Sequence, residues 1–163
     1  TPRLAIAILK GRQLKPLTDK NGWWSSGDSA EIVNEGGSKR LKIIGRVDKA
    51  ITSGGETIFP EQLQERLIEA TSEHKLPVQQ IIFTSRIDEE WGQRILAIVE
   101  LEEGIGSNSE KKIVNTLKKL VKQWPPAERP FSWYCCPKIP THANGKLNYK
   151  KIDLLISNRS PKK

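Results

Sequence analysis

The sequence has no methionine, only two cysteines, and few aromatic residues, which make up 6% of its 163 positions. Cys135 and Cys136 are adjacent, and neighbouring cysteines cannot close a useful disulfide loop. His142 lies nearby, but this spacing lacks the C-x-x-C pattern of zinc ligands, so we expect buried strand residues and no metal site. The absence of methionine leads us to expect a piece of a longer protein. The lack of a disulfide framework favours a reducing, cytoplasmic location.

Long apolar runs are also missing. No stretch approaches eighteen consecutive apolar residues, 36% of the residues are hydrophobic, and the mean hydropathy is −0.52. A membrane-spanning helix needs about 20 predominantly apolar residues. The apolar segment LAIAIL near the start is much shorter and is soon followed by Lys10 and Arg12. We therefore predict no membrane span and no signal peptide.

The net charge of +8 makes nucleic acid a possible partner that has to be weighed. The basic residues, however, do not alternate with aromatic residues that could stack on bases, and no DNA- or RNA-binding signature occurs. We expect solvated surfaces and no nucleic-acid partner. A non-catalytic basic module that binds nucleic acid or a protein stays open as a second class of interpretation. The two basic groups are Lys111, Lys112, Lys118, Lys119 and Lys122, and Lys146, Lys150, Lys151, Arg159, Lys162 and Lys163.

The first 44 residues differ in pattern from the rest of the chain. Two short apolar segments, LAIAIL and AEIV, read as strands between turn signals such as Asn21-Gly22 and Gly36-Gly37. They are too short to bury a core of their own. We therefore expect residues 1–44 to be a β-rich remnant of a larger, N-terminal domain.

Residues 45–160 predict a compact α+β domain, with the order β-β-α-β-β-α-β-α. KAITS and ETIF flank Gly54 and Gly55, a two-residue connection that suits a tight hairpin because glycine tolerates positive φ. Pro60 can begin a helix that runs to about residue 72. QQIIFTS and RILAIVEL read as strands buried on both faces, and FSWYCC reads as another strand.

Two further helices complete this domain, a mixed sheet flanked by helices. Ser107 and Glu110 form a capping-box signature, and the helical face that follows ends at Pro125-Pro126. A loop rich in proline and glycine, PKIPTHANGK, leads into a last helix over about residues 148–156. Residues 161–163 are expected to form a tail.

Three separated stretches contain the residues that could do chemistry: GWWSSGD, IGRVDKAITSGGETIFP and PTHANGK. Taken alone, each has a plain structural explanation. Asp28 could cap a turn, Arg46 and Asp48 could form a surface ion pair of little energetic importance, and Lys146 could be a solvated lysine.

Together, and in this order, the stretches resemble the C-terminal part of the adenylate-forming superfamily, which includes acyl- and aryl-CoA synthetases, luciferases and peptide-synthetase adenylation domains. The family pattern G-R-x-D-x-x-I-x-x-G-G-E-x-I-x-P is complete over residues 45–60, and P-x-x-x-x-G-K is complete over residues 140–146. Its T-G-D occurs with Ser26 in place of threonine, and Ala30 stands where glycine is frequent. The resemblance covers essentially the whole chain.

The resemblance implies an ATP-dependent acid–thiol ligase, which makes an acyl-adenylate and then an acyl-CoA thioester. It assigns ATP and AMP binding to Asp28 and Arg46, catalysis to Lys146, and to Asp48 a hinge about which a small C-terminal lid domain rotates. A carboxylate suits the ribose hydroxyls, and an arginine fork suits ribose and phosphate. The glycine hairpin is implied to line the tunnel for the pantetheine arm of CoA. Its residues are Ser53, Gly54, Gly55 and Glu56.

The implied cofactors are ATP and Mg²⁺, with CoA as co-substrate. The implied partners are a carboxylic acid and an N-terminal domain of the same enzyme. The glycine- and serine-rich phosphate loop of that domain does not occur in these residues. We therefore expect this chain not to complete the reaction alone, and we expect the loop over residues 140–146 to be mobile.

Within the superfamily, Trp91-Gly92-Gln93 and the strand ILAIVEL resemble acyl-CoA ligases more than peptide-synthetase domains. The compact spacing and Glu56 look similar to the o-succinylbenzoate–CoA ligases of menaquinone and phylloquinone biosynthesis. Another acyl- or aryl-CoA synthetase, and an adenylation domain that loads a carrier protein, stay open as alternatives.

Overall fold

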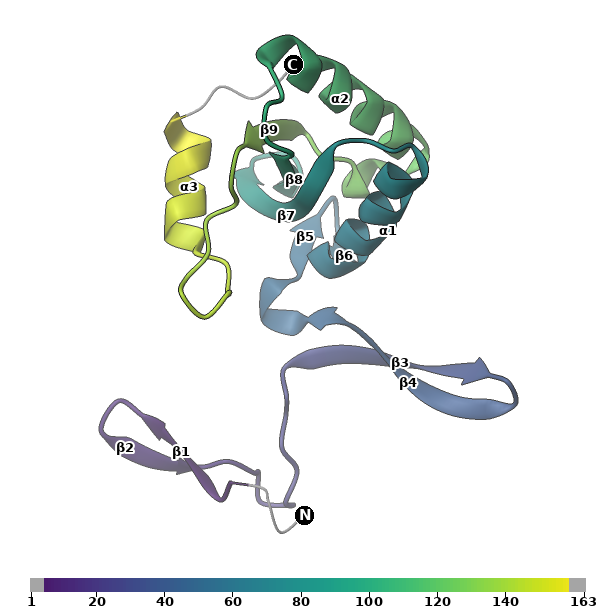
Figure 1. Cartoon of the computed structure of the whole chain (residues 1–163). Helices are drawn as coiled ribbons and strands as arrows, with labels where there is room; N and C mark the ends of the chain where they lie inside the picture. The colour runs from purple at the N-terminus through teal and green to yellow at the C-terminus, as the bar shows by residue number, and fades with distance from the viewer. Residues whose placement is uncertain (1–4, 159–163) are drawn as a thin grey trace. The chain divides into compact units, whose positions relative to one another are not determined.

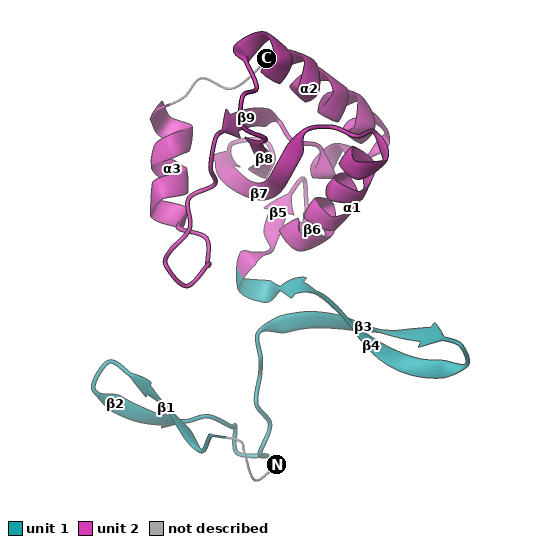
Figure 2. Ribbon diagram, viewed as in Figure 1, with its two compact units in different colours: residues 1–48 teal, residues 49–163 magenta. Residues whose placement is uncertain are grey.

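The computed structural model describes residues 5–158. The chain divides into two compact units, residues 1–48 and 49–163, which Figure 2 shows in different colours. The division thus follows residue 48, whereas the sequence indicated a boundary between residues 44 and 45. That the first unit is a remnant of a larger domain, and the second a lid domain, stays a prediction. The expected tail over residues 161–163 lies outside the described residues, as do the basic residues 159, 162 and 163.

The first unit consists of two antiparallel hairpins (Figure 1). β1 (Ala7–Lys10) pairs with β2 (Gln13–Pro16), and β3 (Asp28–Glu35) pairs with β4 (Ser38–Arg46). The strands expected at LAIAIL and AEIV are confirmed, in a segment more regular than its turn signals indicated. Among the described residues of this unit only Gly45 is buried, so the hairpins enclose no core between their own side chains.

The second unit contains a five-stranded sheet of β5 (Ile51–Ser53), β6 (Glu56–Ile58), β7 (Val78–Asp88), β8 (Gly92–Leu101) and β9 (Ser132–Cys136). The order is β6-β5-β8-β7, with β9 also paired to β8. β8 and β9 run parallel, and the other pairs are antiparallel. The predicted mixed sheet and glycine hairpin are confirmed.

Three α-helices accompany this sheet: α1 (Pro60–Glu73), α2 (Ser107–Leu120) and α3 (Tyr149–Asn158). Short 3₁₀ turns follow β4 at Val47–Lys49 and α2 at Val121–Gln123 and Pro126–Glu128. The order of strands and helices from β5 to α3 is the predicted one. The capping box is wrong, because Gly106 is the N-cap of α2 and its carbonyl accepts a backbone bond from Glu110 at 3.0 Å.

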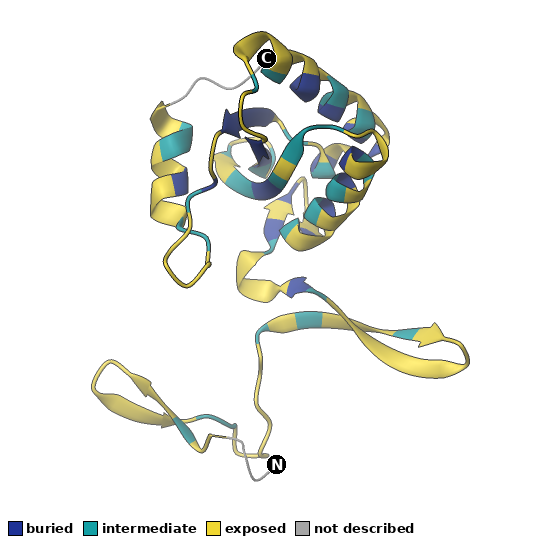
Figure 3. Ribbon diagram, viewed as in Figure 1, coloured by how far each residue is buried: buried dark blue, intermediate teal, exposed yellow. Residues whose placement is uncertain are grey.

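The sheet separates two hydrophobic clusters. Residues of β8 contribute alternately to one cluster and to the other, because successive strand residues face opposite sides of a sheet. Ile95, Ala97, Val99 and Leu101 face the larger cluster, which includes residues of α1 and α2. Leu96 and Ile98 face a smaller cluster, which includes Ile139 and Ile152. Figures 1 and 3 show the same arrangement, with α1 and α2 on one side of the sheet and α3 on the other.

The two cysteines lie on β9 and are both buried, which confirms them as buried strand residues. Cys135 packs in the larger cluster and Cys136 in the smaller one. Within residues 5–158, no helix combines the length and the apolar character that crossing a bilayer requires.

Candidate functional site

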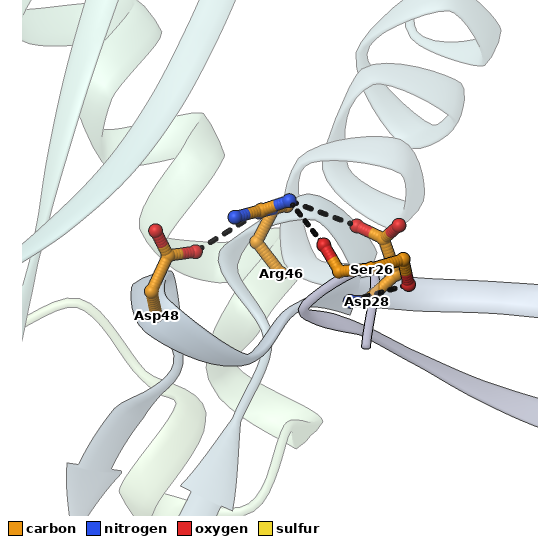
Figure 4. A network of polar contacts seen from close by, with 4 residues as sticks. All are labelled: Ser26, Asp28, Arg46 and Asp48. Atoms are coloured by element: carbon orange, nitrogen blue, oxygen red, sulfur yellow. Dashed lines mark hydrogen bonds and ion pairs between the residues drawn. The ribbon is translucent and has the colours of Figure 1, made fainter. Parts of the chain in front are cut away.

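A polar network around Arg46 joins three of the residues singled out from the sequence (Figure 4). The Arg46 Nε donates to Asp48 Oδ1 at 2.9 Å, and Nη1 lies 3.4 Å from Asp28 Oδ1. Nη1 also donates to the carbonyl oxygen of Ser26 at 3.0 Å. The guanidinium is thereby held between two carboxylates.

Strand pairing explains why these residues meet. Asp28 and Arg46 are direct partners in the β3–β4 ladder, and the Val47 amide donates to the Gly27 carbonyl at 2.9 Å. Gly27 has φ +78°, and a Cβ there would lie 3.2 Å from Arg46 Nη2. Glycine suits this position because of its positive φ, and a Cβ would also require the guanidinium to shift by a few tenths of an ångström.

The side chains of the network are partly exposed, so a ligand can reach them, and the two carboxylates act on the charge of Arg46. The exposed fractions of the side chains are 34% for Asp28, 47% for Arg46 and 60% for Asp48. The hydrogen bond and charge of Asp48, followed by the charge of Asp28, raise the pKa of Arg46 above its ordinary value. Exposed ion pairs contribute at most about 1 kcal/mol to folding. The main effect of the network is therefore to hold a permanently charged donor fork beside two carboxylates.

The glycine hairpin forms a second group of predicted site residues. Gly54 and Gly55 have φ +57° and +86°, and the Gly54 amide donates to the carbonyl of Trp91 at 3.0 Å. A Cβ on Gly54 would lie 2.9 Å from carbons of the Trp91 ring. Ser53 is buried and Glu56 is exposed. The backbone of the hairpin tip is thus open to solvent on one side and covered by an indole on the other.

An arginine–aromatic surface is formed by the β7–β8 hairpin together with Phe131, the residue before β9, and was not identified from the sequence as a site. The Arg94 guanidinium carbon lies 5.0 Å from the centre of the Trp91 ring and 4.4 Å from that of Phe131. Arg86 approaches Phe131 at 4.9 Å. A cation that lies over the face of an aromatic ring is attracted by the negative charge of that face. Two arginines and two rings therefore form one surface, which the Trp91 contact joins to the glycine hairpin.

Lys146 lies in the loop between β9 and α3, where Thr141 and Leu147 form an isolated β-bridge. The His142 amide donates to the Lys146 carbonyl at 2.8 Å, and the Lys146 amide donates to Asn144 Oδ1 at 3.1 Å. Gly145 has φ +79°. Residues 141–146 are all exposed, and within the described chain the Lys146 side chain makes no hydrogen bond or ion pair. The loop is a closed turn that presents its lysine to solvent, and its mobility stays a prediction.

The structure thus places the predicted residues in three local groups. Asp28, Arg46 and Asp48 touch one another in the first unit. In the second unit, residues 53–56 form one hairpin and Lys146 belongs to a separate loop. The roles assigned to these residues stay predictions.

Comparison with known proteins gives a consistent set of relatives. The chain is 31% identical over 134 residues to the 2-succinylbenzoate–CoA ligase of Haemophilus influenzae, and 35% identical over 149 residues to that of Salmonella typhimurium. These alignments cover 82% and 91% of the chain, but 27% and 30% of the relatives. The chain therefore spans less than a third of the length of these curated relatives. No protein-family model matches the chain.

A solved structure agrees with these relatives. A single-residue variant of E. coli MenE with bound OSB-AMS matches with a TM-score of 0.64 and 26% identity. The match covers 90% of this chain and 29% of that one. The similarity in fold thus extends over nearly all of the chain.

Proposed function

Since the chain matches the C-terminal part of adenylate-forming CoA ligases, as its motifs predicted, we propose that it serves in an AMP-forming acid–CoA ligase. The proposed acid is o-succinylbenzoate, within menaquinone or phylloquinone biosynthesis. The observation that supports it best is the identity of 31% and 35% to two 2-succinylbenzoate–CoA ligases over most of the chain. Such an enzyme activates a carboxylate with ATP and transfers the acyl group to a thiol, here in the cytoplasm.

The Arg46 network is proposed to bind the nucleotide. Asp28 carries a carboxylate that can accept hydrogen bonds from two ribose hydroxyls. Arg46 offers a permanent charge, and its described contacts use Nε and Nη1, so Nη2 is available to a ribose or phosphate oxygen. Asp48 is bound to Arg46 and is the last residue of the first unit, a position that suits the proposed hinge.

Lys146 is proposed to act in the formation of the acyl-adenylate. Its ammonium can approach the substrate carboxylate and the α-phosphate, where negative charge gathers in the transition state. Removing one such donor from a preorganised site typically lowers the rate by about 10² to 10³. The exposed turn over residues 141–146 leaves this side chain free to enter a site formed with another domain.

The glycine hairpin and the neighbouring arginine–aromatic surface are proposed to bind CoA. Backbone without a Cβ can approach a slender pantetheine arm closely. Arg94 and Arg86 offer charge for the CoA phosphates, and Trp91 and Phe131 offer ring faces on which a base can stack.

The remaining parts of the reaction need groups beyond these residues. Within residues 5–158, no group of three or more His, Cys, Asp or Glu side chains could hold a metal ion, so Mg²⁺ is assigned to no residue here. ATP, CoA and the acid would be bound together with an N-terminal domain, the proposed partner of this chain.

Turnover by the full-length protein tests this function. Release of AMP is followed with ATP, Mg²⁺ and CoA across a panel of carboxylic acids, o-succinylbenzoate among them, for wild type and Lys146→Ala. We expect CoA-dependent turnover of o-succinylbenzoate and a loss of adenylation of at least about 10²-fold in the variant. Turnover of another acid would keep the ligase and discard the pathway. Transfer only to a carrier protein, or an unaffected variant, would contradict the proposal.

A further inference from the structure

A buried carboxylate on the central strand plays no part in the function proposed so far. Glu100 lies on β8, and its side chain is 2% exposed. Burying a charged carboxylate costs several kcal/mol unless it is paired and hydrogen-bonded. A glutamate in such a place therefore needs specific partners.

Glu100 takes a position where the strand pattern calls for an apolar residue. It follows Leu96 and Ile98 at intervals of two along β8, and both of these pack in the smaller hydrophobic cluster. Its direct neighbours in the sheet are Gln80 on β7 and Cys136 on β9. The carboxylate thus projects from the same face of the sheet as the smaller cluster.

Both carboxylate oxygens bind the segment that follows β9. Oε2 accepts a hydrogen bond from the Ile139 amide at 2.7 Å, and Oε1 accepts one from Lys138 Nζ at 3.1 Å. Hydrogen bonds to an ionised acceptor are shorter and about twice as strong as neutral ones. Lys138 itself is 78% exposed, so the bond to the buried backbone amide is the better shielded of the two.

The segment held by Glu100 is the base of the loop that carries Lys146. Ile139 is 1% exposed and immediately precedes Pro140, whose carbonyl accepts the Asn148 amide at 2.9 Å. At the far end of the loop, Leu147 and Ile152 pack against the same small cluster as Ile139. The loop is therefore closed at its base, and Glu100 supplies a polar anchor at its N-terminal end.

We propose that Glu100 is a positioning residue for Lys146, acting through the Ile139 amide and the base of the loop. The inference rests on the proposed role of Lys146 in adenylation. Small displacements of a reacting group cost much, since a misplacement of about 1 Å can reduce a rate by about 10²-fold. Loss of the anchor should therefore impair the step that needs Lys146 and spare the step that depends on the glycine hairpin.

Separate assays of the two half-reactions in the full-length protein test this. We expect Glu100→Gln, which keeps an acceptor but loses the charge, to slow adenylation about 10-fold, and Glu100→Leu, which leaves the Ile139 amide unpaired, to slow it about 10²-fold. Thioester formation from isolated acyl-adenylate and CoA should stay within about twofold of wild type in the Gln variant. Glu102→Gln, an exposed carboxylate two residues further on, is the matched control and should leave both steps unchanged.

Equal loss of both half-reactions in Glu100→Gln, or unchanged adenylation in both variants, would overturn the proposal. Amide hydrogen exchange provides a readout that needs no activity. In Glu100→Gln we expect faster exchange at Ile139 and Asn148, with exchange in α1 unchanged; unchanged exchange at both amides would overturn the anchor itself. A wild-type enzyme that adenylates no acid would refute the proposed function, while the exchange result would still decide whether Glu100 holds the loop.

Discussion

At the scale of single residues, the glycine hairpin depends on two glycines, Gly54 and Gly55, whose positive φ other residues rarely adopt. Gly54 combines a positive φ with a Trp91 ring so close that a Cβ would lie within 2.9 Å of two ring carbons. Gly55 has a positive φ as well, but nothing lies within 4 Å of its Cβ position. An alanine at Gly55 would therefore meet backbone strain alone, whereas an alanine at Gly54 would meet backbone strain and steric overlap with Trp91.

We predict that Gly54→Ala destabilises the second unit more than Gly55→Ala does. Each substitution should cost about 1 to 2 kcal/mol for a left-handed backbone, and Gly54→Ala should cost about 1 to 3 kcal/mol more because the indole must move. Denaturant unfolding of the two variants measures the difference. In a Trp91→Ala background the excess should vanish, and an excess that persists there would refute the steric explanation.

Arg46 leads to a prediction about pH. Asp48 and Asp28 raise its pKa above the ordinary value, so the guanidinium keeps its charge, and the stabilisation from it, throughout the range from pH 6 to 9 and loses it only at more alkaline pH than an enzyme assay reaches. We predict that the ratio of kcat/KM for ATP between wild type and Arg46→Gln is large and constant from pH 6 to 9. A ratio that changes across this range would show that another titrating group mediates the effect of Arg46.

At the scale of elements, the β7–β8 hairpin carries the arginine–aromatic surface. We predict that Arg94→Ala raises KM for CoA about 10-fold, or about 1.4 kcal/mol, because its guanidinium can no longer pair with a CoA phosphate. The adenylation half-reaction should stay unchanged. Lys111→Ala on α2 removes the same charge from an exposed helix position and serves as the control. If both substitutions raised KM equally, Arg94 would contribute only through the net charge of the protein and not through a specific contact with CoA.

The elements themselves could largely be predicted because their signals are local. The Gly54-Gly55 turn, Pro60 at the start of α1 and the apolar runs of β7 and β8 each determine the structure of their own segment. The cap of α2 was misplaced by one residue, since the Gly106 carbonyl accepts the amide bond without help from a side chain.

The contacts between distant segments could not be predicted in the same way. Glu100 lies 39 residues from Ile139 in sequence, and nothing near either position indicates that they meet. The one available signal was a charged residue inside the run RILAIVEL. Phe131 and Arg94 likewise meet only because β9 lies beside β8. The motifs located the predicted site residues, but only the fold shows what supports them.

At the scale of the whole molecule, the two units differ in how they are stabilised. The second unit has two hydrophobic clusters on the two faces of its sheet. In the first unit Ile32, Leu41 and Ile43 are exposed, and Gly45 is the sole buried residue among those described. Isolated two-stranded hairpins are marginally stable at best in water. The second unit therefore has enough buried apolar surface to fold without the first unit. The first unit lacks such a core, and we do not expect it to fold alone.

We predict that residues 49–163 alone unfold cooperatively, with a midpoint within a few degrees of that of the same transition in the 163-residue chain. Residues 1–48 alone should show no cooperative transition, because their apolar side chains gain no burial from pairing in hairpins. Circular dichroism during thermal unfolding of the three chains measures this. Leu67→Ala, at a fully buried position of α1, should lower the midpoint equally in the long and the short chain. A second unit that loses its cooperative transition on its own would mean that the hairpins of the first unit contribute to its core.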